Sequence, residues 1–213
     1  MTRHHFIRFA AFATASLATV PAFAHHPMGG ETPETAVQGL LSGIGHPVLG
    51  LDHLAFIVAV GIAAVLAGSR FVLPLAFIAL TLAGTGLHLM AVDLPLVEPV
   101  IALSVLAVGA MLASGRAFPV AAYAALFAVA GLFHGFAYGE AIFGAEATPL
   151  VAYLAGFGLT QYAIAVLVGT AVIAASRAST VTPTARLAGA VVMGMGLMIV
   201  GNLAIGAAFP LPV

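Results

Sequence analysis

The segment GHPVLGLDH, residues 45–53, places two histidines and an aspartate in a chain that otherwise has few ionisable side chains. His46 and His53 are seven residues apart, which is two helical turns, so on a continuous helix they would share one face while Asp52 points toward the adjoining face. Imidazole and carboxylate groups together suit borderline divalent metal ions. The pattern predicts a metal site, with a helix cap at His46 and a hydrogen-bonded Asp52 as the alternative interpretation.

A second polar segment, LFHGFAYGE, covers residues 132–140. His134 and Tyr138 share one helix face at four-residue spacing, and Glu140 lies at the expected water boundary. Small residues at every fourth position let another helix approach closely, and these are Gly131, Gly135 and Gly139. We expect this seam to bring His134 against the first apolar stretch, with the metal between them. The alternative is a packing seam alone, with His134 bonded to a backbone carbonyl.

Weaker candidates lie on other apolar stretches. His88, in GTGLHLM, and Glu98, in LVEPV, could add a nitrogen and a carboxylate, or could simply extend to the membrane interface. Gln161 lies near the middle of its stretch, where its amide oxygen could bind a passing ion. The run MGMGLM, residues 193–198, offers thioether sulfur for Cu(I), although packing between glycines is the preferred interpretation.

The elements that must position these residues are membrane-spanning helices. Hydrophobic residues make up 62% of the 213 residues and charged residues 6%, and the mean hydropathy is +1.18, far from an average soluble domain. Six apolar stretches have a length suited to a bilayer, and they cover residues 46–68, 71–91, 97–113, 118–139, 149–175 and 185–207. Prolines near their starts support these boundaries. We expect an all-α, polytopic membrane protein with a six-helix transmembrane bundle.

The first 24 residues have the composition of a secretory signal peptide. Two arginines precede a short apolar run, and Ala22 and Ala24 stand in the arrangement of a cleavage site. A retained first helix is the alternative, but the run is short for a span. Cleavage would leave a periplasmic histidine-containing segment (25–45) and a six-span domain (46–213). The new amine with His25 and His26 would be a capture site for a divalent ion, or an incidental histidine pair.

Charged residues orient the predicted spans. With the mature amino terminus outside, all mature arginines fall in cytoplasmic connections, as the positive-inside rule requires, and these are Arg70, Arg116, Arg177 and Arg186. Six of the seven acidic residues fall outside or at outer helix ends, where they attract cations. We expect a bacterial inner-membrane protein with a periplasmic amino terminus.

Composition also narrows the chemistry. A net charge of −1 and the absence of Trp and Lys give no surface for nucleic acid. The absence of Cys excludes disulfides, thiolate metal sites and cysteine nucleophiles. The chain contains no Walker motif for ATP. A divalent metal ion and membrane lipid are the partners that the sequence supports, and no permanent cofactor is expected.

The segments HPVLGLDH, LAFIVAVG and FHGFAYGE resemble the HupE/UreJ family of hydrogenase and urease accessory membrane proteins, which are regarded as nickel or cobalt permeases. The resemblance covers most of the mature chain. The first family motif, H-P-x-x-G-x-D-H, falls on His46, Asp52 and His53. The second, F-H-G-x-A-H-G followed by a nearby Glu, falls on His134 and Glu140.

Tyr138 departs from the second motif, because the family has another histidine at this position. One nitrogen ligand is therefore replaced, which bears on metal preference and affinity. The resemblance implies uptake of Ni²⁺ or Co²⁺ and an indirect link to nickel or cobalt enzyme maturation or cobalamin synthesis.

A permease, and not an enzyme, is the leading hypothesis. Outer acids would concentrate the ion and the histidine layer would strip part of its hydration. The alternative is an intramembrane hydrolase in which three histidines hold zinc and Asp52 activates water. A membrane-bound protein that hands metal to a maturation factor is disfavoured by short cytoplasmic connections. Glycine stripes in the fourth and sixth stretches fit either packing within one chain or a homo-oligomer.

Overall fold

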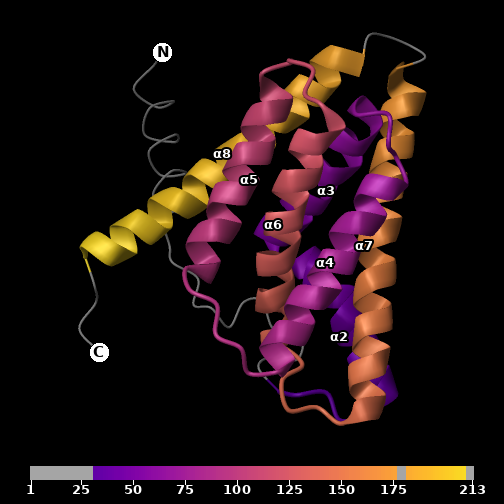
Figure 1. Ribbon diagram of the computed structural model, residues 1–213, viewed down its shortest axis with the longest axis vertical. Helices are drawn as coiled ribbons and strands as arrows, with labels where there is room; N and C mark the ends of the chain where they lie inside the picture. Colours follow the sequence, from indigo (N-terminus) through magenta and orange to yellow (C-terminus); the bar gives the residue numbers. More distant parts are fainter. Residues whose placement is uncertain (1–30, 177–180, 210–213) are drawn as a thin grey trace, which may run out of the picture.

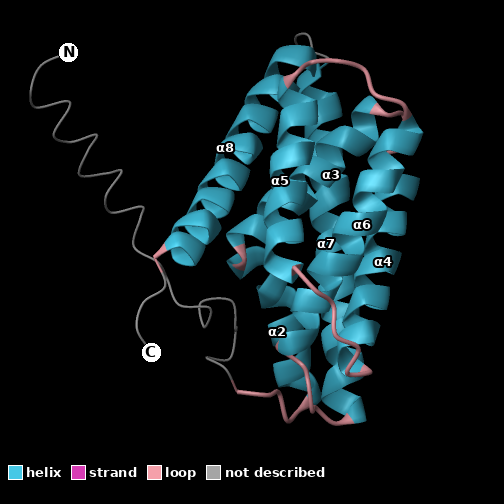
Figure 2. Cartoon of the chain, turned by 60° about the vertical axis from the view of Figure 1, so that its left-hand side comes forward, coloured by secondary structure: helices cyan, strands magenta, loops and turns pink. Residues whose placement is uncertain are grey.

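The computed structural model describes residues 31–176 and 181–209, and every regular element in this part is an α-helix (Figures 1 and 2). The described helices are α2 (Ala36–Leu49), α3 (Leu51–Leu66), α4 (Val72–Leu89), α5 (Val97–Ala113), α6 (Val120–Glu140), α7 (Ala147–Ser176) and α8 (Val181–Ala208). The predicted all-α class is confirmed. Four of them, α4, α6, α7 and α8, are long and apolar enough to cross a membrane, and the bent pair α2–α3 would make a fifth span. α5 is also apolar but has only 17 residues.

Five of the six predicted apolar stretches correspond to single helices. α5 begins and ends at the predicted residues, and the bounds of α4, α6, α7 and α8 differ from the predicted ones by four residues at most. Prolines stand in the first turn of α4, α5, α7 and α8 and at the N-cap of α6, where no intrahelical N–H bond is lost; these are Pro74, Pro99, Pro149, Pro183 and Pro119.

The first predicted stretch, residues 46–68, is wrong as a single helix. α2 ends and α3 begins on either side of Gly50, and the two helices are bent by 78° at this break. Gly50 has an extended backbone, and Pro47 lies in the last turn of α2 instead of a first turn. A Cβ atom on Gly50 would lie 2.6 Å from Cδ2 of His53, so a larger residue at this position would displace the His53 ring. His46 and His53 therefore lie on two helices and not on one continuous face.

α2 begins ten residues before the predicted first span. Thr35 caps it reciprocally with Gln38, because each side chain accepts a hydrogen bond from the backbone N–H of the other residue. The predicted periplasmic segment 25–45 therefore ends in a helix of the bundle from residue 36 onward. The predicted signal peptide (1–24), together with His25 and His26, lies outside the described residues.

α2 and α3 both pack along α7. Gly43 of α2 approaches the backbone of Tyr153, and Gly61 of α3 approaches that of Ala165, so both helices advance along α7 in one direction. The 18 positions from residue 43 to residue 61 match 12 positions on α7, from 153 to 165. The interval is longer on α2 and α3 than on α7 because the two helices are bent by 78° at Gly50, while the pair as a whole follows α7.

The glycine seam of α6 packs against α4. A Cβ on Gly135 would collide with the backbone of Thr81, and one on Gly139 would collide with the side chain of His88. The expectation that this seam faces the first span is therefore wrong. A stripe of small residues specifies a close approach but carries no information about which helix makes it.

Charge is divided between the two ends of the bundle. The loops α4–α5 and α6–α7 lie at one end, and the loops α3–α4 and α5–α6 lie at the other (Figure 1). The first is the acidic end, with Glu31, Glu34, Asp93, Glu98, Glu140 and Glu146. The second is the arginine end, with Arg70, Arg116 and Arg186. Between them lies an aromatic block of buried rings, formed by Phe56, Phe77 and Phe127.

Candidate metal-binding site

A cleft of about 510 Å³ lies at the acidic end, where residues of α2 to α6 meet the carboxyl-terminal part of α8. Six of the nine predicted ligand residues line it, namely His46, Asp52, His53, His88, Glu98 and Glu140. The seventh, His134, is buried behind His53, and the other two, His25 and His26, lie outside the described residues. Three carboxylates and no arginine line this cleft, so it favours cations.

His53 is held by His134 of α6. The Nδ1 atoms of the two rings are 2.8 Å apart, and Nε2 of His134 is 3.1 Å from Oγ of Ser104. Ser104 donates its only proton to the carbonyl oxygen of Ile101 at 2.7 Å, so it accepts from His134 Nε2. In a neutral His134 the Nδ1 atom is then the acceptor, and Nδ1 of His53 carries the proton. A neutral His53 ring then has its lone pair on Nε2.

His46 is held in the same way by Tyr153 of α7. Its Nδ1 atom lies 2.9 Å from the Tyr153 hydroxyl, which donates its proton to the carbonyl oxygen of Tyr138 at 2.8 Å. The hydroxyl oxygen therefore accepts from Nδ1 of His46, and the neutral ring keeps a lone pair on Nε2. A ligand histidine that donates its other N–H to a fixed acceptor is the usual arrangement around protein-bound metals. The imidazoles of His46 and His53, with centroids 5.8 Å apart, both have this form.

Asp52 lies in the first turn of α3, beside these two rings. Its Oδ1 atom accepts a hydrogen bond of 2.9 Å from the backbone N–H of His53. The positive end of the helix stabilises the ionised carboxylate. Asp52 thus adds an anionic oxygen to the wall that carries the imidazole of His53.

Tyr138 occupies the centre of the histidine group. Its ring centroid lies 4.8 Å from that of His46 and 4.2 Å from that of His53, and the residue is fully buried. Its hydroxyl is buried and finds no hydrogen-bond partner in the described part of the chain. The side chain that departs from the second motif is therefore a wall of the site between the two candidate ligands.

The remaining predicted ligands lie further along the cleft. His88 packs edge-on against Phe136, with centroids 4.6 Å apart, and its buried Nδ1 atom has no hydrogen-bond partner within residues 31–176 and 181–209. Glu98 and Glu140 are exposed, at the start of α5 and the end of α6. Within the described residues, no three His, Asp or Glu side chains are placed to hold one ion together. The cleft therefore offers several partial sites along its walls.

Sequence reasoning misses Tyr153 as a residue of the site, and it misses the hydrogen bond that Ser104 makes to a histidine. These two residues lie 107 and 30 residues from the histidines that they contact, in stretches that are otherwise apolar. The only signal is the spacing of Tyr153, Phe157 and Gln161 at every fourth position, which marks one buried face of α7. In the methionine run, Met195 packs against the apolar core, whereas Met198 is exposed.

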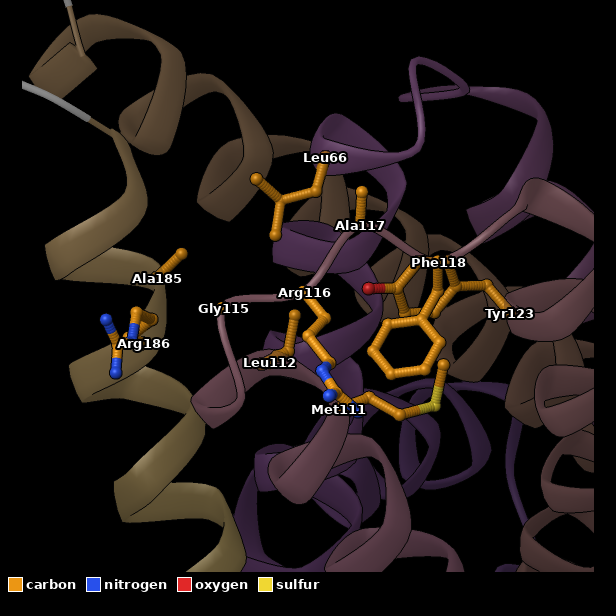
Figure 3. A pocket seen from close by; sticks show the side chains of 10 residues that line it. All are labelled: Leu66, Met111, Leu112, Gly115, Arg116, Ala117, Phe118, Tyr123, Ala185 and Arg186. Atoms are coloured by element: carbon orange, nitrogen blue, oxygen red, sulfur yellow. The ribbon is translucent and has the colours of Figure 1, made fainter.

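A second, smaller cleft of about 170 Å³ lies at the arginine end. Figure 3 shows Arg116 and Phe118 beside Met111, with Arg186 across from them on α8. Its lining contains apolar and cationic side chains and no histidine or carboxylate. The two ends of the bundle therefore differ in chemistry, and the metal-ligand types gather at the acidic one.

The long apolar helices define a multi-pass membrane protein with a histidine and carboxylate cleft at one end. The chain belongs to the HupE / UreJ protein family, whose family model matches residues 13–199. Protein HupE of Rhizobium leguminosarum bv. viciae is 33% identical over 192 residues, which are 88% of this chain and 96% of that protein. No solved structure matches the chain. The resemblance drawn from the two motifs is confirmed.

Proposed function

We propose that the protein is a permease of the bacterial inner membrane that takes up Ni²⁺ or Co²⁺ for metalloenzyme or cobalamin synthesis. The observation that carries this proposal is the fixed orientation of two imidazoles in one cleft. His46 and His53 each use Nδ1 in a buried hydrogen bond, and both side chains line the cleft together with the carboxylate of Asp52. Imidazole nitrogen with carboxylate oxygen suits Ni²⁺ and Co²⁺, and the family membership supports the same cargo.

The proposed topology has six crossings with the acidic end in the periplasm. The pair α2–α3 is one broken span, in keeping with the common direction of both helices along α7. α5 is a short span of about 26 Å, close to the thickness of the hydrocarbon core. The described arginines gather at one end, which the positive-inside rule places in the cytoplasm. Broken helices of this kind commonly form the ion sites of transporters.

Within this proposal the ion meets a series of ligands. Glu98 and Glu140 attract it to the cleft, and His46, Asp52 and His53 replace part of its water shell. His134 acts through His53 by fixing its tautomer. His88 adds a further nitrogen on the cleft wall. The predicted capture by His25 and His26 stays a prediction.

Partial coordination suits conduction. A closed site with four protein ligands would trap the ion, whereas a few ligands at successive positions bind and release it. The membrane potential acting on a doubly charged ion supplies about 4.6 kcal/mol per 100 mV. A zinc hydrolase would instead need three histidines around one resident ion, and the described residues form no such group.

Cobalt uptake into proteoliposomes tests the proposal. We expect influx of labelled Co²⁺ that added Ni²⁺ inhibits, and we expect His46→Ala and His53→Ala each to lower it at least about tenfold, since each removes a nitrogen ligand. Thr170→Val is the matched control, because that hydroxyl is exposed and bonds only to its own helix. Absence of influx, together with about one tightly bound zinc per purified chain, would favour the hydrolase instead.

A further inference from the structure

Gln161 is a buried polar residue that the cleft does not use. It lies on the face of α7 that carries Tyr153 and Phe157, eight residues beyond Tyr153. Eight residues correspond to about 12 Å along a helix axis. Gln161 therefore lies about 12 Å deeper in the bundle than Tyr153, whose hydroxyl holds His46. Its side chain is fully buried.

The orientation of the Gln161 amide is fixed by Thr81 of α4. The Thr81 hydroxyl donates its only proton to the carbonyl oxygen of Ile78 at 2.8 Å, so it can only accept from Gln161. The amide nitrogen, Nε2, is the atom that faces Thr81, at 3.3 Å. Oε1 must then point away, and it has no hydrogen-bond partner among the described residues.

A buried carbonyl oxygen without a donor is unfavourable unless a donor or a cation reaches it. The described arginines lie at the far end of the bundle, on loops and at the start of α8, and the chain contains no lysine. On α4, His88 of the cleft is followed inward by Thr85 and then by Thr81, one helical turn apart each time. No cationic side chain of the described residues therefore supplies the missing partner of Oε1, and the polar residues of α4 lie between the cleft and this oxygen.

We propose that Gln161 Oε1 is a second binding position for the transported divalent cation, deeper in the bundle than the histidine cleft. This inference rests on the proposed permease function. The ion at this position keeps most of its water shell, since one protein oxygen is too few to replace it. Neutral oxygens bind Ni²⁺ and Co²⁺ more weakly than imidazole does, so the ion leaves the deeper site readily toward the arginine end.

Two measurements on the full chain separate this site from the cleft. Equilibrium binding of Co²⁺ to purified protein in detergent reports on the cleft, and Co²⁺ influx into proteoliposomes reports on the whole path. For Gln161→Leu we expect cleft affinity within about twofold of the wild type and influx lowered about tenfold or more, because a deep ligand of the path is lost. Gln161→Glu keeps the shape and adds charge, so we expect a lower KM for Co²⁺ with a lower maximal rate.

Thr85→Val is the matched control, because it removes a buried hydroxyl of α4 that is already bonded to the carbonyls of Thr81 and Gly135. We expect it to leave influx near the wild-type rate. If Gln161→Leu shows normal influx, the deeper site is wrong but the permease function is not affected. Oε1 of the wild-type residue would then contact only water. Loss of cleft binding in both Gln161 variants would also overturn it, because the residue would then only hold α7 against α4. Absence of influx in the wild type would overturn the permease and this site together.

Discussion

A histidine binds a metal ion through a lone pair, so the group that holds its other ring nitrogen decides whether it can serve as a ligand. Tyr153 does this for His46 and the Ser104–His134 pair does it for His53. In both cases the chain of hydrogen bonds ends on a backbone carbonyl, which can only accept. Helix backbones therefore fix the chemistry of the cleft, and no second charged group is needed behind the ligands.

Tyr153→Phe tests this dependence at the first ligand. The variant keeps the ring but removes the acceptor of the His46 N–H, so we expect the affinity for Co²⁺ to fall about 10–100-fold. Isothermal titration of purified protein measures the change. Tyr162→Phe is the control, because this ring lies on the same helix and packs against the main apolar core. Equal affinities of both variants and the wild type would contradict the assigned tautomer.

The ligands themselves could be predicted from the sequence, but their supports could not. An imidazole or a carboxylate in an apolar stretch is conspicuous, because burying it is costly unless it has a function. Tyr153 is not conspicuous in this way, since a tyrosine is common near the end of a membrane helix. Its contact with His46 depends on the packing of α2 against α7, which no local pattern encodes.

At the scale of helices, glycines determine which elements meet. Gly135 of α6 lies so close to Thr81 that a single added carbon would overlap the α4 backbone. The same contact holds α6 beside α4. His134 and Tyr138 lie at other positions of α6. The α4–α6 seam thus positions His88 of α4 and His134 of α6 at the site.

Gly135→Ala is therefore expected to destabilise the fold. Forcing a methyl group into this seam should cost about 1–3 kcal/mol, which lowers the thermal midpoint in detergent by about 2–4 °C for each kcal/mol. Gly158→Ala is the control on α7, because its added carbon would lie 3.7 Å from Ile78 Cγ2, an ordinary contact. Equal midpoints for the two variants would show that the seam is looser than the structure indicates.

Hydropathy predicts five helices well and fails at the first span for a physical reason. A sliding average follows apolarity, and apolarity continues through Gly50 because Val48, Leu49 and Leu51 flank it. The break is set by Pro47 and Gly50, which are two positions in a long stretch. The error changes the predicted shape of the first span but not the predicted site, because His46 and His53 still line the same cleft from two helices.

At the scale of the whole molecule, two clefts lie at opposite ends with the aromatic block between them. Phe56 contacts both His134, with centroids 4.7 Å apart, and Phe127, with centroids 5.8 Å apart. Phe127 in turn contacts Tyr123, which lines the cleft at the arginine end. The histidine cleft is therefore separated from the opposite end by packed rings, and in the proposed topology it is accessible only from the periplasm.

Single cysteines test this one-sided access, because the chain contains none of its own. Ala137→Cys lies in the wall of the histidine cleft and Ala117→Cys in the lining of the opposite one. In intact spheroplasts we expect a membrane-impermeant thiol reagent to modify Ala137→Cys, and saturating Co²⁺ to slow that reaction by occupying the cleft. Ala117→Cys should react only after lysis. Labelling of Ala117→Cys alone from outside would invert the proposed orientation, since the acidic end would then face the cytoplasm.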